Sequence, residues 1–201
     1  MINYLTSTRV WVRFISLFML TMLIFLMCWV IGYYALPEGI LRGKFASAAL
    51  VGDRAADTFL AEFTRIALVN VVMLMPIVAG NRVFKHKEIP LGYVIPLAWG
   101  AIYALIIGTN STSIAMPERL TPSLMIFTRS GLYEIGAFVL AAAATSGISA
   151  YRVIRFVPPE SEKITPAPML LKVIHWPALM IAIMLLLAAN AWEAYQIVQF
   201  S

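Results

Sequence analysis

The chain has 201 residues, of which 61% are hydrophobic and 12% are charged, and its formal net charge is +5. Soluble domains carry about 25% charged residues, so this chain has too few polar side chains to cover a surface that faces water. A helix that crosses a bilayer needs about 20 mostly apolar residues, so the length allows about four to six membrane spans and excludes a separate soluble domain.

Five apolar stretches predict an all-α bundle of about five transmembrane helices, which forms a single membrane domain over residues 1–201. The predicted spans cover about residues 10–36, 58–81, 89–108, 126–151 and 173–198. The first stretch is longer than the apolar core of about 7–15 residues in a signal peptide, so we expect an uncleaved anchor. Charged and apolar residues are interspersed over residues 37–57, which predicts either a short helix on the membrane surface or an ordinary connection.

The positive charges of the connecting segments predict the orientation of the chain. If the N-terminus is cytoplasmic, the inner segments hold nine cations: Arg9, Arg13, Arg82, Lys85, Lys87, Arg152, Arg155, Lys163 and Lys172. The outer segments then hold five: Arg42, Lys44, Arg54, Arg119 and Arg129. Because cytoplasmic loops carry an excess of Lys and Arg, we expect a multi-pass protein of the plasma (inner) membrane with its N-terminus cytoplasmic and its C-terminus outside.

Small residues recur along one face of two predicted spans. The third span carries Gly92, Gly100, Ala104 and Gly108, and the fourth carries Gly131, Gly136, Ala137, Ala141 and Gly147. Helices in lipid associate through close backbone approach at such residues, because burial of one apolar side chain against another brings no gain there. We expect these faces to form helix contacts within one subunit, and a homodimer interface is the alternative.

Four polar or charged side chains, which cost free energy to place in lipid, lie within the predicted spans: Arg65, Asn70, Glu134 and Glu193. Arg65 and Glu134 both lie about seven residues from the outer end of their spans, at a depth of about 10 Å. Equal depth permits an ion pair, and Glu193 lies at a level from which it could share Arg65. The functional interpretation is a site in the outer leaflet for a lipid head group, a peptide or a proton. The favoured interpretation is a structural clamp that sets the register of the helices.

The sequence offers no constellation for catalysis, metals or cofactors. His86 and His175 lie near the ends of different spans, and neither has a ligand partner at helical spacing, so we expect no metal site. The single cysteine, Cys28, excludes a disulfide framework and a thiolate cluster. No acid–base pair is identifiable, so we expect that the protein is not an enzyme and needs no cofactor. No run of Lys and Arg with interleaved aromatics is present, so nucleic acid is not an expected partner.

Residues 129–143 read RSGLYEIGAFVLAAA. This stretch resembles the stage II sporulation protein M family, whose members carry His-Gly-x-x-Glu at the start of a helix rich in small residues. Two further pieces agree with the family in order, so that the resemblance covers about residues 55–155: Phe63 to Gly80 with Asn70, and Pro90-Leu91-Gly92 followed by Gly100. The family histidine falls at Ser130 here, whereas Gly131 and Glu134 are retained. A role for an imidazole is therefore not carried over, but a role for the carboxylate is.

The resemblance implies a multi-spanning protein of the cell envelope without known catalytic activity. Its partners would be the lipid bilayer, other envelope proteins and, as the alternative noted above, a second copy in a homodimer. We therefore expect a non-enzymatic scaffold or assembly subunit of a membrane complex. The alternative is a permease-like transport or lipid-handling subunit that works as a dimer. A water-accessible cavity that reaches Glu134 would favour transport, and a dry, packed cluster would favour the scaffold.

Overall fold

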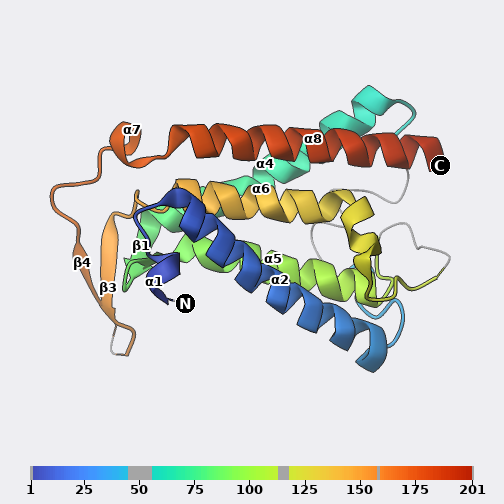
Figure 1. Cartoon of the computed structure of the whole chain (residues 1–201), viewed down its shortest axis with the longest axis horizontal. Coiled ribbons are helices and arrows are strands. Elements are labelled where there is room, and N and C mark those ends of the chain that lie inside the picture. Colours follow the sequence, from blue (N-terminus) through green and yellow to red (C-terminus); the bar gives the residue numbers. More distant parts are fainter. Residues whose placement is uncertain (1, 45–55, 113–117, 158, 201) are drawn as a thin grey trace.

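The structure is a computed structural model, and it describes residues 2–44, 56–112, 118–157 and 159–200. The helices are α1 (Ile2–Leu5), α2 (Val10–Ala35), α4 (Phe59–Val83), α5 (Val94–Gly108), α6 (Ser130–Ala144), α7 (Leu170–Val173) and α8 (Trp176–Phe200), with 3-10 turns η1 (Leu91–Tyr93) and η2 (Leu124–Thr128). The long helices run between two ends of the molecule (Figure 1). A small sheet and the N-terminus lie at one end, which we call the sheet end, and the C-terminus lies at the other.

Four helical stretches in the described part of the chain are long and apolar enough to cross a membrane. They are Val10–Ala35, Phe59–Val83, Leu91–Gly108 and Trp176–Gln199, and they correspond to the first, second, third and fifth predicted spans. Large apolar side chains are exposed along these helices, among them Leu23, Leu68 and Met184. Such exposure is costly in water but natural against lipid. The arrangement therefore fits a multi-pass membrane protein.

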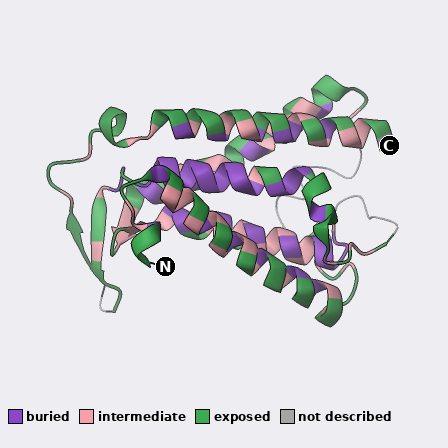
Figure 2. Cartoon of the chain, in the orientation of Figure 1, coloured by how far each residue is buried: buried purple, intermediate pink, exposed green. Residues whose placement is uncertain are grey.

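The segment predicted as a span over residues 126–151 differs from that prediction. Its helix, α6, has only 15 residues and ends at Ala144, and a helix of that length rises about 22 Å. All of its residues are buried except Tyr133 and Glu134, and Figure 2 shows it as the most buried helix of the chain. The apolar run continues beyond Ala144, but the Thr145 backbone leaves the helical conformation and the chain turns into a strand.

A four-stranded sheet at the sheet end departs from the all-α prediction. It consists of β1 (Phe84–His86), β2 (Ile89–Pro90), β3 (Tyr151–Arg155) and β4 (Glu160–Lys163), in the order β2-β1-β3-β4. β1 pairs in parallel with β3, and the outer two pairs are antiparallel. β1 follows α4 and β3 follows α6, so the sheet forms because both helices deliver the chain to the same end of the molecule (Figure 1).

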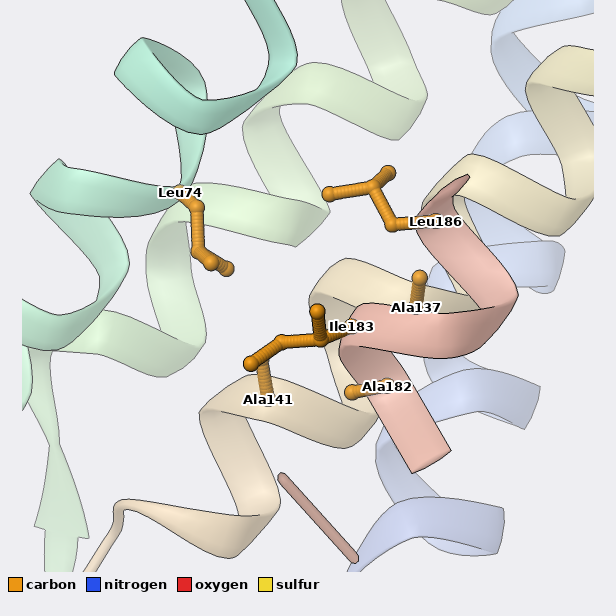
Figure 3. A pocket seen from close by; sticks show the side chains of 6 residues that line it. All are labelled: Leu74, Ala137, Ala141, Ala182, Ile183 and Leu186. Atoms are coloured by element: carbon orange, nitrogen blue, oxygen red, sulfur yellow. The ribbon is translucent and has the colours of Figure 1, made fainter. Parts of the chain in front are cut away.

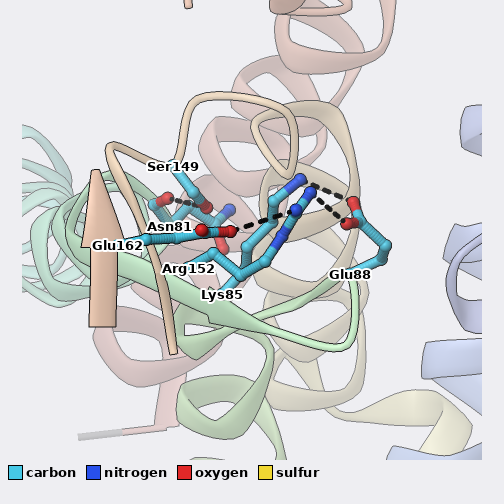
Figure 4. Close-up of polar contacts among 6 residues, drawn as sticks. All are labelled: Asn81, Lys85, Glu88, Ser149, Arg152 and Glu162. Atoms are coloured by element: carbon cyan, nitrogen blue, oxygen red, sulfur yellow. Dashed lines mark hydrogen bonds and ion pairs between the residues drawn. The ribbon is translucent and has the colours of Figure 1, made fainter. Parts of the chain in front are cut away.

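Polar contacts fasten this sheet to the helices (Figure 4). The Ser149 hydroxyl donates to the Asn81 backbone oxygen at 2.7 Å, which ties the end of α4 to the segment that leads into β3. Glu88, between β1 and β2, accepts from both Lys85 and Arg152, and Arg152 also contacts Glu162 on β4 at 3.3 Å. The hydrogen bond from Lys85 lowers the pKa of Glu88 below its ordinary value of 4.5, and the positive charges of Lys85 and Arg152 add to this effect, whereas burial opposes it.

This ion-pair chain predicts a dependence of stability on pH. A carboxylate whose pKa is lower in the folded state contributes stability above its ordinary pKa and loses that contribution as the pH falls through the folded pKa. We expect the wild type to exceed Glu88→Gln in stability at pH 6, by less than about 1 kcal/mol because the pair is largely exposed. The two proteins should converge as the pH falls below about 4.5. Thermal unfolding of both in detergent micelles from pH 6 to pH 3 measures this, and an unchanging difference would contradict it.

The small-residue face of α5 lies against α2. Ala104 is fully buried, and a Cβ atom on Gly100 would approach the Thr21 methyl group to 2.9 Å. A Cβ atom on Gly108 would lie 2.8 Å from the Trp29 backbone oxygen, a distance that real Cβ atoms essentially never show. At the start of the same stretch, Gly92 packs against Asn81 and the Ile77 carbonyl of α4. The spacing of these residues therefore serves contacts within one chain.

The small residues around α6 have several different neighbours. Gly131 packs under the Tyr103 ring of α5, and Gly147 lies next to Val173. Ala137 and Ala141 face α8 across a hollow that has no room for a water molecule, lined by Leu74, Ala137, Ala141, Ala182, Ile183 and Leu186 (Figure 3). Gly136 has more space, because a Cβ atom there would lie 3.7 Å from Phe18 and 3.8 Å from Leu185.

A pair of glycine substitutions tests the close approach of α2 and α5. Gly108→Ala places a methyl group against backbone atoms that cannot move aside, so we expect a loss of about 1–3 kcal/mol in the free energy of unfolding. Gly136→Ala is the matched control, because its new methyl group meets only ordinary contacts and alanine favours a helix by up to about 1 kcal/mol. Unfolding in mixed micelles measures both variants, and equal stability for the two would contradict the packing described here.

At the end opposite the sheet, the Arg119 side chain binds the C-terminal ends of α2 and α5. Its guanidinium donates to the backbone oxygens of Gly32 (2.6 Å) and Leu36 (2.9 Å) at the end of α2, and to that of Gly108 (3.1 Å) at the end of α5. A cation at a helix C-terminus also offsets the negative end of the helix dipole.

The predicted surface helix over residues 37–57 lies largely outside the described residues. Within that range, residues 37–44 are described, and they form turns and irregular chain.

Candidate functional site

Three helices bring polar side chains together at the middle of the molecule. Asn70 lies near the midpoint of α4, and Asn190 lies near the midpoint of α8. The side-chain amides of Asn70 and Asn190 are 2.6 Å apart, and the Asn70 amide nitrogen donates to Glu134 Oε1 on α6 at 3.1 Å. An unpaired polar group in hydrocarbon costs several kcal/mol, on the order of 2–7, so these side chains satisfy one another where lipid and apolar side chains cannot.

Two carboxyl groups meet in this cluster. Glu193 lies one turn after Asn190 on α8, and its carboxyl group lies close to that of Glu134 and to the Ser130 hydroxyl at the start of α6. We call Asn70, Ser130, Glu134, Asn190 and Glu193 the intramembrane cluster. Its components come from α4, α6 and α8.

Arg65 has a different partner from the predicted one. Its ion pair among the described residues is with Glu62, three residues earlier on α4, and not with Glu134. Glu62 is fully buried and also accepts from the Ala56 backbone nitrogen at 2.8 Å, so it closes the first turn of α4. Glu62 and Arg65 still act electrostatically on Glu193. The predicted residues thus gather in one region, but the Arg65–Glu134 ion pair is wrong.

The surroundings of the cluster are close-packed. The hollow shown in Figure 3 lies between α4, α6 and α8 and has no room for a water molecule. A larger hollow of about 360 Å³ opens on α8 and is lined by Ala188, Trp192, Tyr195, Gln196 and Gln199. Neither of these two hollows is lined by Asn70 or Glu134. Asn70, Glu134 and Asn190 therefore form a hydrogen-bonded contact between helices.

The remaining candidate groups lie apart from this cluster. His86 is in the sheet, where its Nδ1 lies 2.9 Å from the Val153 backbone oxygen, and His175 precedes α8. Cys28 is half-buried on α2. No group of three or more His, Cys, Asp or Glu side chains placed to hold a metal ion occurs within residues 2–44, 56–112, 118–157 and 159–200.

Sequence reasoning missed three residues of this region. Asn190 is a polar residue at the middle of a predicted span. A polar side chain in the lipid interior costs free energy, and this argument, which identified Asn70, applies equally to Asn190. Ser130 was noted only as the position of a missing histidine. Glu62 was visible as a charge at the start of a span, where a carboxylate three residues before an arginine favours a local pair.

Comparison with protein families, with curated proteins and with solved structures finds no match for this chain.

Double-mutant cycles test which pairs interact. We expect Asn70→Ala and Glu134→Ala to be non-additive, with a coupling free energy of about 0.6–1.7 kcal/mol, the range known for hydrogen bonds between helices in lipid. The matched cycle of Arg65→Ala with Glu134→Ala should be additive within about 0.5 kcal/mol, because the two groups share no direct contact. Unfolding of the three single variants, the two double variants and the wild type in mixed micelles measures both cycles. The opposite order of coupling would restore the ion pair that the sequence predicts.

Proposed function

We propose that this chain is a non-enzymatic integral membrane protein that serves as a scaffold or assembly subunit of a membrane complex. The observation that carries the proposal is the intramembrane cluster, in which Asn70, Glu134 and Asn190 are bonded to one another beside a hollow that excludes water. A transport path needs polar groups that face a continuous aqueous route. A set of polar groups that bind each other instead sets the register of three helices, as a scaffold requires.

The proposed topology has five crossings, with α6 as an inner crossing that is shielded from lipid. η2 and α6 together cover Leu124–Ala144, enough chain to approach the hydrocarbon thickness of about 30 Å. The N-terminus and the segments of the sheet carry the nine cations counted above, which supports a cytoplasmic sheet end and an outer C-terminus in a plasma (inner) membrane. The resemblance of residues 129–143 to the stage II sporulation protein M family supports a place in the cell envelope.

Glu134→Gln is the variant that tests the scaffold. Glutamine keeps the size and most of the hydrogen bonding of Glu134 but cannot exchange a proton. We expect the tagged wild type, extracted from its own membrane in polymer nanodiscs, to form a complex of fixed stoichiometry with other integral membrane chains in native mass spectrometry. Glu134→Gln should form the same complex, whereas Glu134→Ala should lose it through damage to the helix contacts.

The contrary outcome is equally measurable. Purified wild type reconstituted alone into vesicles should show no proton or lipid flux above that of empty vesicles. A flux that Glu134→Gln abolishes would overturn the scaffold and establish the second candidate, a transport or lipid-handling subunit. That candidate rests on one observation, the two neighbouring carboxyl groups of Glu134 and Glu193 at half-buried positions within the spans. A homodimer as the only species in nanodiscs would also favour it.

A further inference from the structure

The tip of the β3–β4 hairpin exposes large apolar side chains. Ile154 is 49% exposed, Phe156 58% and Val157 86%. These residues do not belong to a membrane-spanning helix, so the lipid that covers α2 or α8 does not account for them. The Phe156 ring also packs against that of His86 on β1, with ring centroids 4.8 Å apart, but more than half of its side chain remains exposed. Large apolar side chains exposed together on a short, charged hairpin mark a surface that meets another apolar phase.

The position of the hairpin indicates that the apolar phase in contact with these side chains is the lipid bilayer. In Figure 1 the hairpin lies at the sheet end, where it runs across the ends of the long helices. Figure 2 shows exposed residues along both of its strands. Spanning helices end at a bilayer surface, so a segment at the sheet end lies near that surface. At the same end, Leu171 on α7 is also exposed, and the Trp176 indole bonds to its backbone oxygen at 3.1 Å. A tryptophan at a helix end is typical of the level of lipid head groups.

The charge of the sheet end is complementary to anionic lipids. Its segments carry the nine cations counted above against three carboxylates, which are Glu88, Glu160 and Glu162. Next to the apolar tip, Arg155 is only loosely paired with Glu160, at 3.7 Å, and most of its side chain is exposed. Each Lys or Arg near an anionic surface contributes about 1 kcal/mol of attraction. Long cationic side chains can reach phosphate groups while neighbouring apolar residues dip below them.

A second copy of the chain is a less suitable partner for the hairpin than the bilayer surface. β4 is an edge strand, and two copies could pair through it about a two-fold axis perpendicular to the sheet. Residues directly opposite in such a pair share one face, so Glu160 would oppose Glu162 or Glu162 would oppose itself across the axis. Like charges directly opposite each other destabilise a strand pair. The edge strand therefore discourages self-association.

We propose that the β3–β4 hairpin lies on the bilayer surface at the sheet end, where Phe156 and Val157 insert at the boundary between head groups and acyl chains and Arg155 binds the phosphate groups of anionic lipids. This surface contact holds for either orientation of the chain in the membrane. It is also independent of the scaffold proposed above, because it concerns a segment far from the intramembrane cluster.

An environment-sensitive fluorophore at the tip tests the contact in the full-length protein. The chain has one cysteine, so Cys28→Ala supplies a background free of native thiols. In that background, Val157→Cys and, as the matched control on β4, Ser161→Cys are labelled with nitrobenzoxadiazole and reconstituted into phosphatidylcholine vesicles with and without phosphatidylglycerol. We expect a blue-shifted emission at position 157 that a nitroxide on the upper acyl chain quenches severalfold more strongly than at position 161. This quenching should weaken when phosphatidylglycerol is omitted.

Two results would overturn the proposal. If aqueous iodide quenches the label at 157 as freely as the label at 161, and lipid nitroxide quenches neither, the tip faces water. If the label at 157 is shielded from iodide and from lipid nitroxide alike, a protein surface covers it. Circular dichroism of each labelled variant distinguishes both outcomes from a loss of fold.

Discussion

The rest of the structure depends on α6 having almost no free surface. A helix surrounded by other helices in a membrane cannot be held by the hydrophobic effect, because lipid is as apolar as its neighbours. It needs small side chains for close approach and polar groups for specific contacts. Ala137 and Ala141 provide the first along the face toward α8, and Glu134 provides the second near its start. The positions of α4 and α8 on either side follow from those two demands.

Two polar anchors at different depths fix α4 against α6. Asn70 contacts Glu134 near the start of α6, and Asn81 donates to the Ala142 backbone oxygen (2.9 Å) and to the Thr145 hydroxyl (2.7 Å) near its end. Two separated contacts determine both the distance and the register of a helix pair, which one contact alone does not. The Asn81 side-chain oxygen has no hydrogen-bond partner and faces Gly92, whose lack of a Cβ atom allows that approach. The absence of a side chain at Gly92 thus lets η1 pack against α4 at Asn81, the residue that also bonds to α6.

The sequence predicts the features whose cause is local. The spacing of Gly100, Ala104 and Gly108 places them on one helical face, and the structure uses that face against α2. Asn70 and Glu134 stand out because polar groups in lipid need partners, whatever the fold. The predicted partner of Arg65 is wrong because equal depth permits a contact but does not create one, and Glu62 is nearer along the same helix. The sheet has no local signal, since β1 and β3 are joined only after two helices have returned the chain to the same end.

Arg119 has a consequence for the order in which the chain assembles. α2 and α5 run in the same direction, so their negative ends lie side by side and repel until a cation reaches them (Figure 1). That cation comes from residue 119, eleven positions after α5 has ended. During synthesis, the first and third spans are therefore complete before the group that joins their ends has left the ribosome. The contacts of Arg119 with the ends of α2 and α5 can therefore form only after both helices have been synthesised.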